Sequence, residues 1–315
     1  MANPKLRFRF REPTVDTNLP LTDGTVKIDG FDLEVLGGSE DSRFEADARD
    51  EGFGALVQRK VEGAPDVCIP AFPNRKFRLS YIFVNAASGI EKPKDLEGRR
   101  VGIPGWGNTA GVWARGALQN YYNVDLAAIK WHATRPGDGS GLPEGVTLKP
   151  IKGNLSEMLV NGELDAVIEP NVLPSITNED PRVRRLFPNY KAEEQEYYRQ
   201  TGIFPISHVV TLRQEFVDEH PNAPLALLKA FRKARDEAFN RILGSDPQYL
   251  VISWVNAAVQ EQRELMGHDY FAYNVKDNHR PLDAVTQFAH QQGLTPTKLD
   301  YNSFFAEDAA ALAGM

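Results

Sequence analysis

Apolar and polar residues alternate in short runs along most of the chain, a pattern that predicts many short β-strands. Helical stretches separate these runs in the middle of the chain, and this alternation predicts an α/β fold with largely parallel sheets. The runs that we interpret as strands cover residues 6–10, 31–36, 66–72, 80–85, 100–104, 129–134, 146–151, 164–169 and 206–212.

Two strand-to-helix units stand out in the middle of the chain. In the first, an apolar strand over residues 100–104 leads through a Gly-rich loop into a helix over 109–122, with Asn108 as its expected cap. In the second, Asn154 and Glu157 have the spacing of a capping box, and another apolar strand follows the helix. We expect both units to belong to one α/β domain.

Strand signals stop after residue 221, and helical periodicity replaces them. Residues 223–243 place their apolar side chains on one helical stripe, and further helices are expected over 247–265 and 281–292. The sequence pattern leaves open whether this helical tail is a separate domain or packs back on the beginning of the chain.

Composition indicates a globular protein of about two domains. The chain has 315 residues, of which 42% are hydrophobic and 25% charged, so the disordered and fibrous classes are excluded. Asp and Glu outnumber Lys and Arg by 43 to 36, which leaves a net charge of -7. This charge argues against a nucleic-acid or anionic-lipid partner.

Cysteine content and hydropathy point to a soluble protein of the cytoplasm. Cys68 is the single cysteine, so no internal disulfide forms, and no metal-binding motif with suitable spacing is present. We also find no secretory signal and no apolar stretch of the ~20 residues that a membrane span requires. We therefore expect no metal and no membrane partner.

Several sequence blocks occur in an order that is typical of one family. FPNRKFR, SGIEKPKDLEGRRVGIP and TAGVWARG come first, and YYRQTGIFPISHVV and MGHDYFAYNVKDNHRPL follow. In these blocks the chain resembles the 4,5-dihydroxyphthalate decarboxylase family, whose members are soluble relatives of the solute-binding proteins of transporters. The resemblance covers most of the chain from about residue 66 onward.

The resemblance implies a bilobed α/β fold, the periplasmic-binding-protein type II fold. In this fold two crossover segments join two α/β lobes, and the ligand lies in the cleft between them. The crossovers map near residues 81–85 and 202–207. Residues 1–85 and 207–315 are then expected to form one lobe and residues 86–206 the other, so that the tail packs back on the beginning.

The resemblance also implies an activity. The expected function is a lyase of aromatic compound catabolism, a decarboxylase that works without a cofactor on a hydroxylated aromatic carboxylic acid of the 4,5-dihydroxyphthalate kind. Such a reaction needs an acid, an anion clamp and a dry pocket. The expected partner is a small aromatic carboxylate. The sequence leaves open whether the protein forms a homo-oligomer.

A non-catalytic solute-binding protein for a small carboxylate or heterocycle is the alternative. Family members carry FRHS where this chain reads FRLS, so Leu79 replaces a histidine that we expect near the cleft. This departure favours the alternative, whereas the missing secretory signal opposes it. A different lyase or hydrolase reaction on the same scaffold is a third reading, since a fold does not fix a function.

Two segments supply candidates for substrate binding. Trp106, Asn108 and Thr109 lie in the loop between a strand end and a helix start, where free N–H groups favour an anion, although an ordinary strand-to-helix connection has the same sequence. The other candidates precede the first crossover, where a guanidinium suits a carboxylate. They are Asn74, Arg75, Arg78 and Ser80.

Spacing refines these candidates. Arg75 and Arg78 are three residues apart, so in an extended segment they point to opposite faces, and only one of them needs to meet the ligand. A role for both arginines as charged residues at a solvent-exposed strand end explains the sequence equally well. Arg115 is a further candidate, but its place two turns into a helix favours a surface charge. Trp113, on the same helix, is expected in the core.

Three residues are candidates for proton transfer, namely His208, Glu169 and His268. His208 follows the second crossover, which is expected to run along the floor of the cleft, and an imidazole delivers protons near neutral pH. Glu169 ends a predicted strand, and His268 follows a predicted helix. We favour His208 as the acid, although a lone histidine is more often structural.

Overall fold

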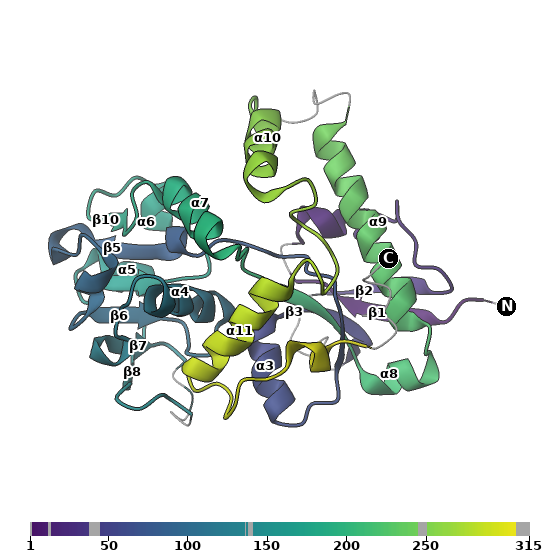
Figure 1. Ribbon diagram of the computed structural model, residues 1–315, viewed down its shortest axis with the longest axis horizontal. Coiled ribbons are helices and arrows are strands. Elements are labelled where there is room, and N and C mark those ends of the chain that lie inside the picture. Colours follow the sequence, from purple (N-terminus) through teal and green to yellow (C-terminus); the bar gives the residue numbers. More distant parts are fainter. Residues whose placement is uncertain are drawn as a thin grey trace.

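Two β-sheets form the framework of the protein. The computed structural model describes residues 2–11, 14–37, 45–135, 137, 141–244 and 251–306. Within these residues one sheet has five strands in the order β2-β1-β3-β11-β4, and the other has six in the order β10-β5-β9-β6-β7-β8. Figure 1 shows the two sheets in separate halves of the molecule, which is therefore bilobed.

The five-stranded sheet combines strands from both ends of the chain. Strand β1 is parallel to β2 and β3, whereas β11 is antiparallel to both β3 and β4. The sheet is therefore mixed rather than largely parallel. Its strands are β1 (Lys5–Arg9), β2 (Asp32–Leu36), β3 (Ala48–Gly52), β4 (Val67–Ile69) and β11 (His208–Leu212).

The six-stranded sheet is built from the middle of the chain. Strands β6, β7, β8 and β9 are parallel, as expected for strand-to-helix units, and β5 and β10 are antiparallel additions at one edge. The strands are β5 (Ile82–Asn85), β6 (Arg100–Ile103), β7 (Lys130–Ala133), β8 (Leu148–Pro150), β9 (Ala166–Ile168) and β10 (Val183–Arg185).

The helices of the first three quarters of the chain include the two for which a cap was predicted. Asn108 accepts a hydrogen bond from the backbone N of Gly111, and Asn154 accepts from the backbone N atoms of Ser156 and Glu157, so both predicted caps are confirmed. These helices are α1 (Leu19–Thr22), α3 (Phe53–Val61), α4 (Thr109–Asn120), α5 (Leu155–Val160), α6 (Pro174–Thr177), α7 (Tyr190–Thr201) and α8 (Gln214–Glu219).

The tail is helical, as predicted. Helix α9 (Ala223–Leu243) has the predicted bounds, α10 is Val255–Met266, and α11 is His279–Gln291. The helix expected over 247–265 starts later than predicted, and residues 247–250 lie outside the described residues. No helix among the described residues has both the length and the apolar character that crossing a membrane demands.

The tail packs on the beginning of the chain. Leu227 and Phe231 of α9 share one hydrophobic core with Leu6 and Phe8 of β1, and the rings of Phe8 and Phe231 lie 5.6 Å apart. Figure 1 shows α9 beside β1 and β2. Burial of these large apolar side chains accounts for the way the two ends of the chain form one lobe.

The predicted lobes, residues 1–85 with 207–315 and residues 86–206, stay a prediction. The strand pairing places the first boundary more exactly. Strand β5 is hydrogen-bonded to β9 and β10 in the six-stranded sheet, so the first crossing lies before residue 82 rather than at 81–85. The two crossing segments run side by side: Arg75 and Ile206 form an antiparallel bridge, and Ser207 N donates to Asn74 O at 2.9 Å.

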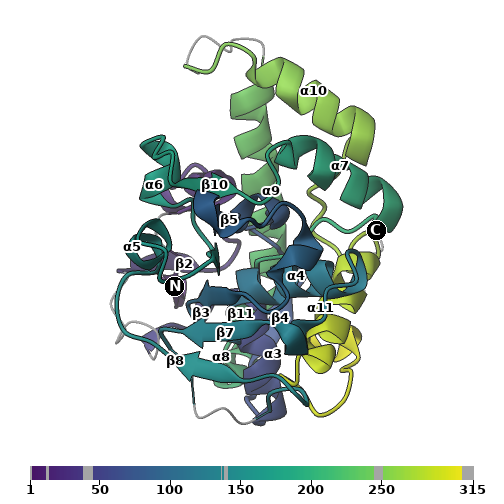
Figure 2. The same ribbon diagram turned by 90° about the vertical axis from the view of Figure 1, so that its left-hand side faces the viewer.

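A third connection between the lobes runs through α4 and α11, which Figure 2 shows side by side. One face of α4 packs into the core of the first lobe and another into the core of the second. Gln292, which follows α11 and is fully buried, accepts hydrogen bonds from Trp106 Nε1 on its backbone O and from Arg115 Nε on its side-chain Oε1, both at 2.8 Å. Its amide donates to Val112 O at 2.9 Å.

Candidate functional site

A cleft of about 740 Å³ lies between the lobes, and both crossing segments contribute to its lining. Gly52 and His208 come from the five-stranded sheet, and Asn108 and Thr109 come from the start of α4. Ser207 lies between these walls on the second crossing segment. The volume is within the range of about 300–1,000 Å³ that is typical of small-molecule sites.

Two helix N-termini meet at this cleft. Helix α3 begins after Gly52 and α4 begins after Asn108, and the backbone N of Gly54 donates to Thr109 Oγ1 at 3.0 Å. A Cβ atom on Gly54 would lie 3.1 Å from Gly107 O, so glycine permits this close approach of the two helix starts. The positive ends of both helix dipoles therefore favour an anion here.

The cleft is positively charged although the chain as a whole is negative. Its six cationic lining residues against the two anionic ones, Asp50 and Glu51, leave an excess of four positive charges, with histidine counted as neutral. Such a local excess attracts carboxylates from solution. The cationic residues are Arg9, Arg11, Arg49, Lys76, Arg78 and Arg135.

His208 stands on the cleft wall with a carboxylate behind it. Its Nδ1 atom lies 2.7 Å from Asp50 Oδ1, and the side chains of His208 and Asp50 are 13% and 1% exposed. Strands β11 and β3 are neighbours with His208 opposite Gly52, which places the two side chains together. The Asp50 carboxylate fixes the proton on Nδ1 and leaves Nε2 as the ring nitrogen available to a substrate.

Asp50 belongs to strand β3, which the sequence pattern did not predict. Three consecutive charges, Arg49, Asp50 and Glu51, oppose the assignment of a buried strand. They are buried because they pair with charged neighbours: Arg49 Nη2 lies 2.8 Å from Asp66 Oδ2, and Arg59 bonds to both Asp66 and Glu51. One feature of the sequence could have drawn attention to Asp50 as a functional residue: the run of three charges stands directly before an apolar helix.

Four further cationic residues of the cleft lining were not among the candidates chosen from the sequence, namely Arg9, Arg11, Lys76 and Arg135. Arg9 and Arg11 did have a signal, because they alternate with Phe8 and Phe10 in the way that a strand with one buried face requires. Lys76 lies between the two predicted arginines. Arg135 follows β7, at the carboxyl end of a parallel sheet, where ligands commonly bind.

Arg78 faces the cleft and ties three segments together. Its Nη1 donates to Pro170 O at 3.1 Å and its Nη2 to Ser207 Oγ at 2.7 Å, while its Nε has no hydrogen-bond partner. Burial lowers the pKa of the guanidinium to about 10. Asn74 lines the cleft as well, so these two members of the predicted group lie at the site.

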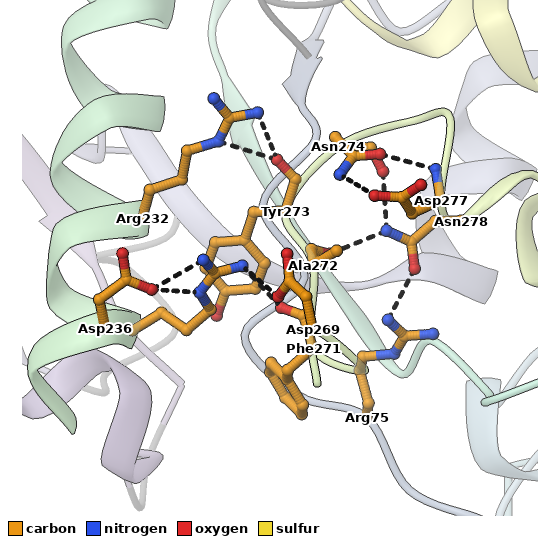
Figure 3. A network of polar contacts seen from close by, with 11 residues as sticks. Arg75, Arg232, Asp236, Asp269, Phe271, Ala272, Tyr273, Asn274, Asp277 and Asn278 are labelled. Atoms are coloured by element: carbon orange, nitrogen blue, oxygen red, sulfur yellow. Dashed lines mark hydrogen bonds and ion pairs between the residues drawn. The ribbon is translucent and has the colours of Figure 1, made fainter. Parts of the chain in front are cut away.

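Arg75 and Ser80 lie outside the cleft lining. Arg75 Nη1 donates to Asn278 Oδ1 at 2.6 Å (Figure 3), and its Nη2 donates to Phe204 O at 2.7 Å. Burial lowers the pKa of Arg75 to about 9. Ser80 N donates to Glu194 Oε1 at 2.8 Å, and both Arg75 and Ser80 line a second cavity instead.

Trp106 and Arg115 are buried in the junction of the lobes and do not line the cleft. The surface position favoured for Arg115 is wrong, because the side chain is 0% exposed and its guanidinium carbon lies 3.9 Å from the centre of the Trp106 ring. Burial alone lowers the Arg115 pKa to about 9. Trp113 is in the core, as predicted, at 1% exposed.

Glu169 and His268 differ in their distance from the site. Glu169 follows β9 and precedes Pro170 and Asn171, which line the cleft, and its half-buried carboxyl group has a pKa raised to about 7 by burial, opposed by the charge of Arg135. His268 is exposed and lies at a hollow of about 230 Å³ beside Arg235 and Asp269. The structure thus separates His268 from the cleft.

Leu79 does not lie at the cleft either, contrary to expectation. It is 2% exposed and packs in the hydrophobic core of the second lobe. The replacement of a histidine at this position therefore changes a core residue rather than a cleft residue. Within the described part of the chain, no group of three or more His, Cys, Asp or Glu side chains has the arrangement of a metal site.

Comparisons with proteins of known sequence identify relatives, one of which covers nearly the whole chain. The family described as NMT1/THI5 like matches residues 52–130. A 4,5-dihydroxyphthalate decarboxylase of Comamonas testosteroni is 30% identical over 318 residues, which cover 96% of each chain. A protein of the same name from Pseudomonas putida is 32% identical over 199 residues, 57% of this chain and 76% of the relative.

Solved structures share the fold. The periplasmic aliphatic sulphonate binding protein SsuA from Escherichia coli superposes with a TM-score of 0.60 and 12% identity, over 98% of this chain and 100% of SsuA. The desulfurization enzyme DSZB gives a TM-score of 0.55 and 14% identity, over 99% of both chains. These likenesses confirm the bilobed fold of solute-binding proteins that the sequence motifs imply.

Proposed function

Because the chain belongs to the 4,5-dihydroxyphthalate decarboxylase family, we propose that it is a carboxy-lyase that removes CO₂ from a hydroxylated aromatic carboxylate of aromatic compound catabolism. The observation that carries this proposal is the His208–Asp50 pair on the wall of a cationic cleft. The pair supplies an acid, and the cations together with the two helix starts supply an anion clamp.

The proposed reaction uses one proton and releases one molecule of CO₂. His208 in its imidazolium form, with a proton on each ring nitrogen, gives the Nε2 proton to the ring carbon that bears the carboxylate and becomes neutral. A hydroxyl group ortho or para to that carbon loses its proton and becomes a ring carbonyl. The bond between the ring carbon and the carboxylate then breaks. Its electron pair restores the aromatic ring, the carbonyl regains a proton, and CO₂ leaves. The chain's own side chains suffice for each of these steps.

Arg78 and the start of α4 are the proposed carboxylate contacts. Arg78 is buried, and its Nε lacks a partner among the described residues, so a substrate oxygen gives it one. Asn108 and Thr109 line the facing wall. An aromatic acid with two carboxylates would thus be held from both lobes, with the reacting carbon turned toward His208.

Glu169 is the second proton carrier in this proposal. Its raised pKa, about 7, means that a substantial fraction of the carboxyl group is protonated at neutral pH. It lies one residue before Pro170, which lines the cleft, and near Arg135, which also lines it. We assign to Glu169 the exchange of protons between solvent and the substrate hydroxyl.

A non-catalytic solute-binding protein is the second candidate, and the fold shared with SsuA favours it. In that class the lobes close on a ligand by a hinge motion. Here Gln292, Trp106 and Arg115 join the lobes by buried hydrogen bonds in addition to the crossing segments. A cleft with this additional connection is preorganised, as catalysis requires, so we favour the enzyme.

The test measures CO₂ release and product mass from a panel of hydroxylated benzoates and phthalates. We expect turnover of at least one dihydroxyphthalate, and we expect His208→Gln to lower turnover by about 10²–10⁴-fold with substrate affinity largely retained. His132→Gln is the matched control, because His132 lies on β7 and does not line the cleft. Tight binding of the panel without any CO₂ release would instead identify a solute-binding protein.

A further inference from the structure

A second cavity of about 590 Å³ adjoins the cleft, separated from it by the crossing segments. Asn74 and Lys76 line both cavities, which places the first crossing segment as the wall between them. Helices α7, α9 and α10 each contribute residues to the lining of the second cavity. Its volume is again that of a small-molecule site, and the proposed reaction makes no use of it.

Helix α10 covers this cavity without packing into a core. None of its residues is buried, yet its apolar side chains Ala258, Val259, Leu265 and Met266 line the cavity. Figure 1 shows α10 set apart from both sheets, between α7 and α9. An apolar helix stripe normally faces a packed core, so a stripe that faces a hollow indicates that another molecule completes the contact.

The rim and the floor of the cavity are held in place. Glu261 of α10 accepts from Lys191 Nζ at 2.6 Å and from Gln195 Nε2 at 2.8 Å, both on α7. On the floor, Figure 3 shows Arg75 bonded to Asn278, at the end of a segment that Arg232 of α9 anchors by two hydrogen bonds to Tyr273 O. The cavity is therefore largely preformed.

The lining of the second cavity favours an aromatic ligand that has no net charge. Seven aromatic side chains surround the space, and the charged lining residues balance, with Asp16, Glu194 and Glu261 against Arg75, Lys76 and Lys191. The cleft, by contrast, has an excess of four positive charges. The aromatic residues are Phe77, Tyr81, Tyr190, Phe204, Phe239, Tyr270 and Phe271.

Two buried polar atoms of the lining residues have no hydrogen-bond partner. Arg75 is 8% exposed, and its Nε is unpartnered although both terminal nitrogens are bonded. The Oδ1 atom of Asn74 is also buried and without a partner. One donor and one acceptor thus remain for a hydroxyl group, which can satisfy both.

We propose that the cavity beneath α10 is a second ligand site, which binds an uncharged aromatic compound with a hydroxyl group, that is, a phenol of one or two rings. The rings would stack among Phe204, Phe239 and Phe271, and the hydroxyl group would meet Arg75 and Asn74. This site is additional to the cleft and does not depend on the proposed reaction.

Calorimetric titration with 2-naphthol, an uncharged phenol, tests the proposal. We expect one bound molecule per chain, and we expect Val259→Trp to abolish binding because its indole fills the cavity. Ala257→Trp is the matched control, since Ala257 is an exposed residue of α10 that does not line the cavity. Phe239→Ala should weaken binding about three- to tenfold through loss of one aromatic contact.

Two results would overturn the proposal. The first is a failure of the binding test: either the unaltered protein does not bind 2-naphthol, or Val259→Trp and Ala257→Trp bind it equally. In the second case circular dichroism must show that both variants are folded. The second is displacement of 2-naphthol by phthalate in direct competition, which would place the phenol in the cationic cleft. Nuclear Overhauser contacts from 2-naphthol to the methyl groups of Val259 and Leu265 would support the site directly, even if one variant fails to fold.

Discussion

His208 Nδ1 and Asp50 Oδ1 lie 2.7 Å apart although 158 positions separate the two residues in the sequence. Their strands, β11 and β3, are neighbours in the five-stranded sheet, so the end of the second crossing segment is paired with the N-terminal part of the chain. Asn18 Nδ2 approaches the other oxygen of Asp50 at 3.5 Å. The carboxylate is thus fixed on the side of the imidazole that faces away from a substrate.

Asp50→Asn tests the role of this carboxylate as a positioning group. We expect kcat to fall by about 10²–10⁴-fold with little change in KM, because the amide no longer fixes the imidazole tautomer or stabilises its charged form. Asp47→Asn is the control, since Asp47 is equally buried but pairs with Arg7 and Arg213 away from the cleft. Equal kinetics for the two variants would contradict the assignment.

Arg78→Ala is expected to weaken substrate binding through loss of the buried guanidinium. A hydrogen bond to a charged group contributes about 1.5–3 kcal/mol, which corresponds to a rise in Kd of about 10–150-fold. Lys94→Ala is the control, because Lys94 is exposed and pairs with Glu97 at 2.7 Å far from the cleft. The measurement is calorimetry with phthalate. Similar, small effects in both variants would argue against the clamp.

The part of this site that was predictable from the sequence is the part that local rules determine. The Gly-rich loop and the Asn108 cap depend on neighbours within four residues, and α9 follows from its own apolar stripe. These features need no knowledge of the rest of the chain.

The unpredicted part depends on long-range pairing of charges. Strand β3 is buried only because Arg59 and Asp66 neutralise Arg49 and Glu51, and no local pattern indicates those partners. The prediction for Arg115 failed because of another distant residue. Its position in the helix suggests a surface residue, yet Gln292, 177 positions later, packs against it and accepts a hydrogen bond from it. Propensity is a weak guide wherever a distant segment completes the environment.

Glu169→Gln should change how stability depends on pH. The pKa of Glu169 is raised from 4.5 to about 7 in the folded protein, so between these values the native state holds a proton that the unfolded state has released. Its contribution to stability is therefore complete below about pH 4.5 and is lost as pH rises through about 7.

Urea unfolding of the unaltered protein and of Glu169→Gln at pH 5, 6, 7 and 8 measures this effect. The free energy of unfolding of the unaltered protein, relative to the variant, should fall steadily over the series. Glu163→Gln provides the comparison, because Glu163 is exposed and does not line the cleft. A constant difference between the Glu169 variant and the unaltered protein across this range would show that Glu169 titrates normally.

Gln292→Ala is expected to destabilise the junction between the lobes. The substitution removes the side-chain bonds to Arg115 Nε and Val112 O and leaves a fully buried guanidinium, whose Nη1 already has no partner, with one contact fewer. One bond to a charged group and one to a neutral group together contribute about 2–4 kcal/mol. Gln291→Ala is the matched control, because the Gln291 side chain bonds with the exposed Asn120 across the same pair of helices.

The same pair of variants tests whether the junction prevents hinge opening. In the unaltered protein and in Gln291→Ala, we expect X-ray scattering to give the same radius of gyration with and without phthalate, because Trp106, Arg115 and Gln292 already join the lobes. In Gln292→Ala the free protein should expand and contract again when phthalate binds, since a ligand then supplies the differential contact that favours the closed state. A large ligand-dependent contraction of the unaltered protein would instead show the hinge motion of a solute-binding protein, and the preorganised cleft would have to be abandoned.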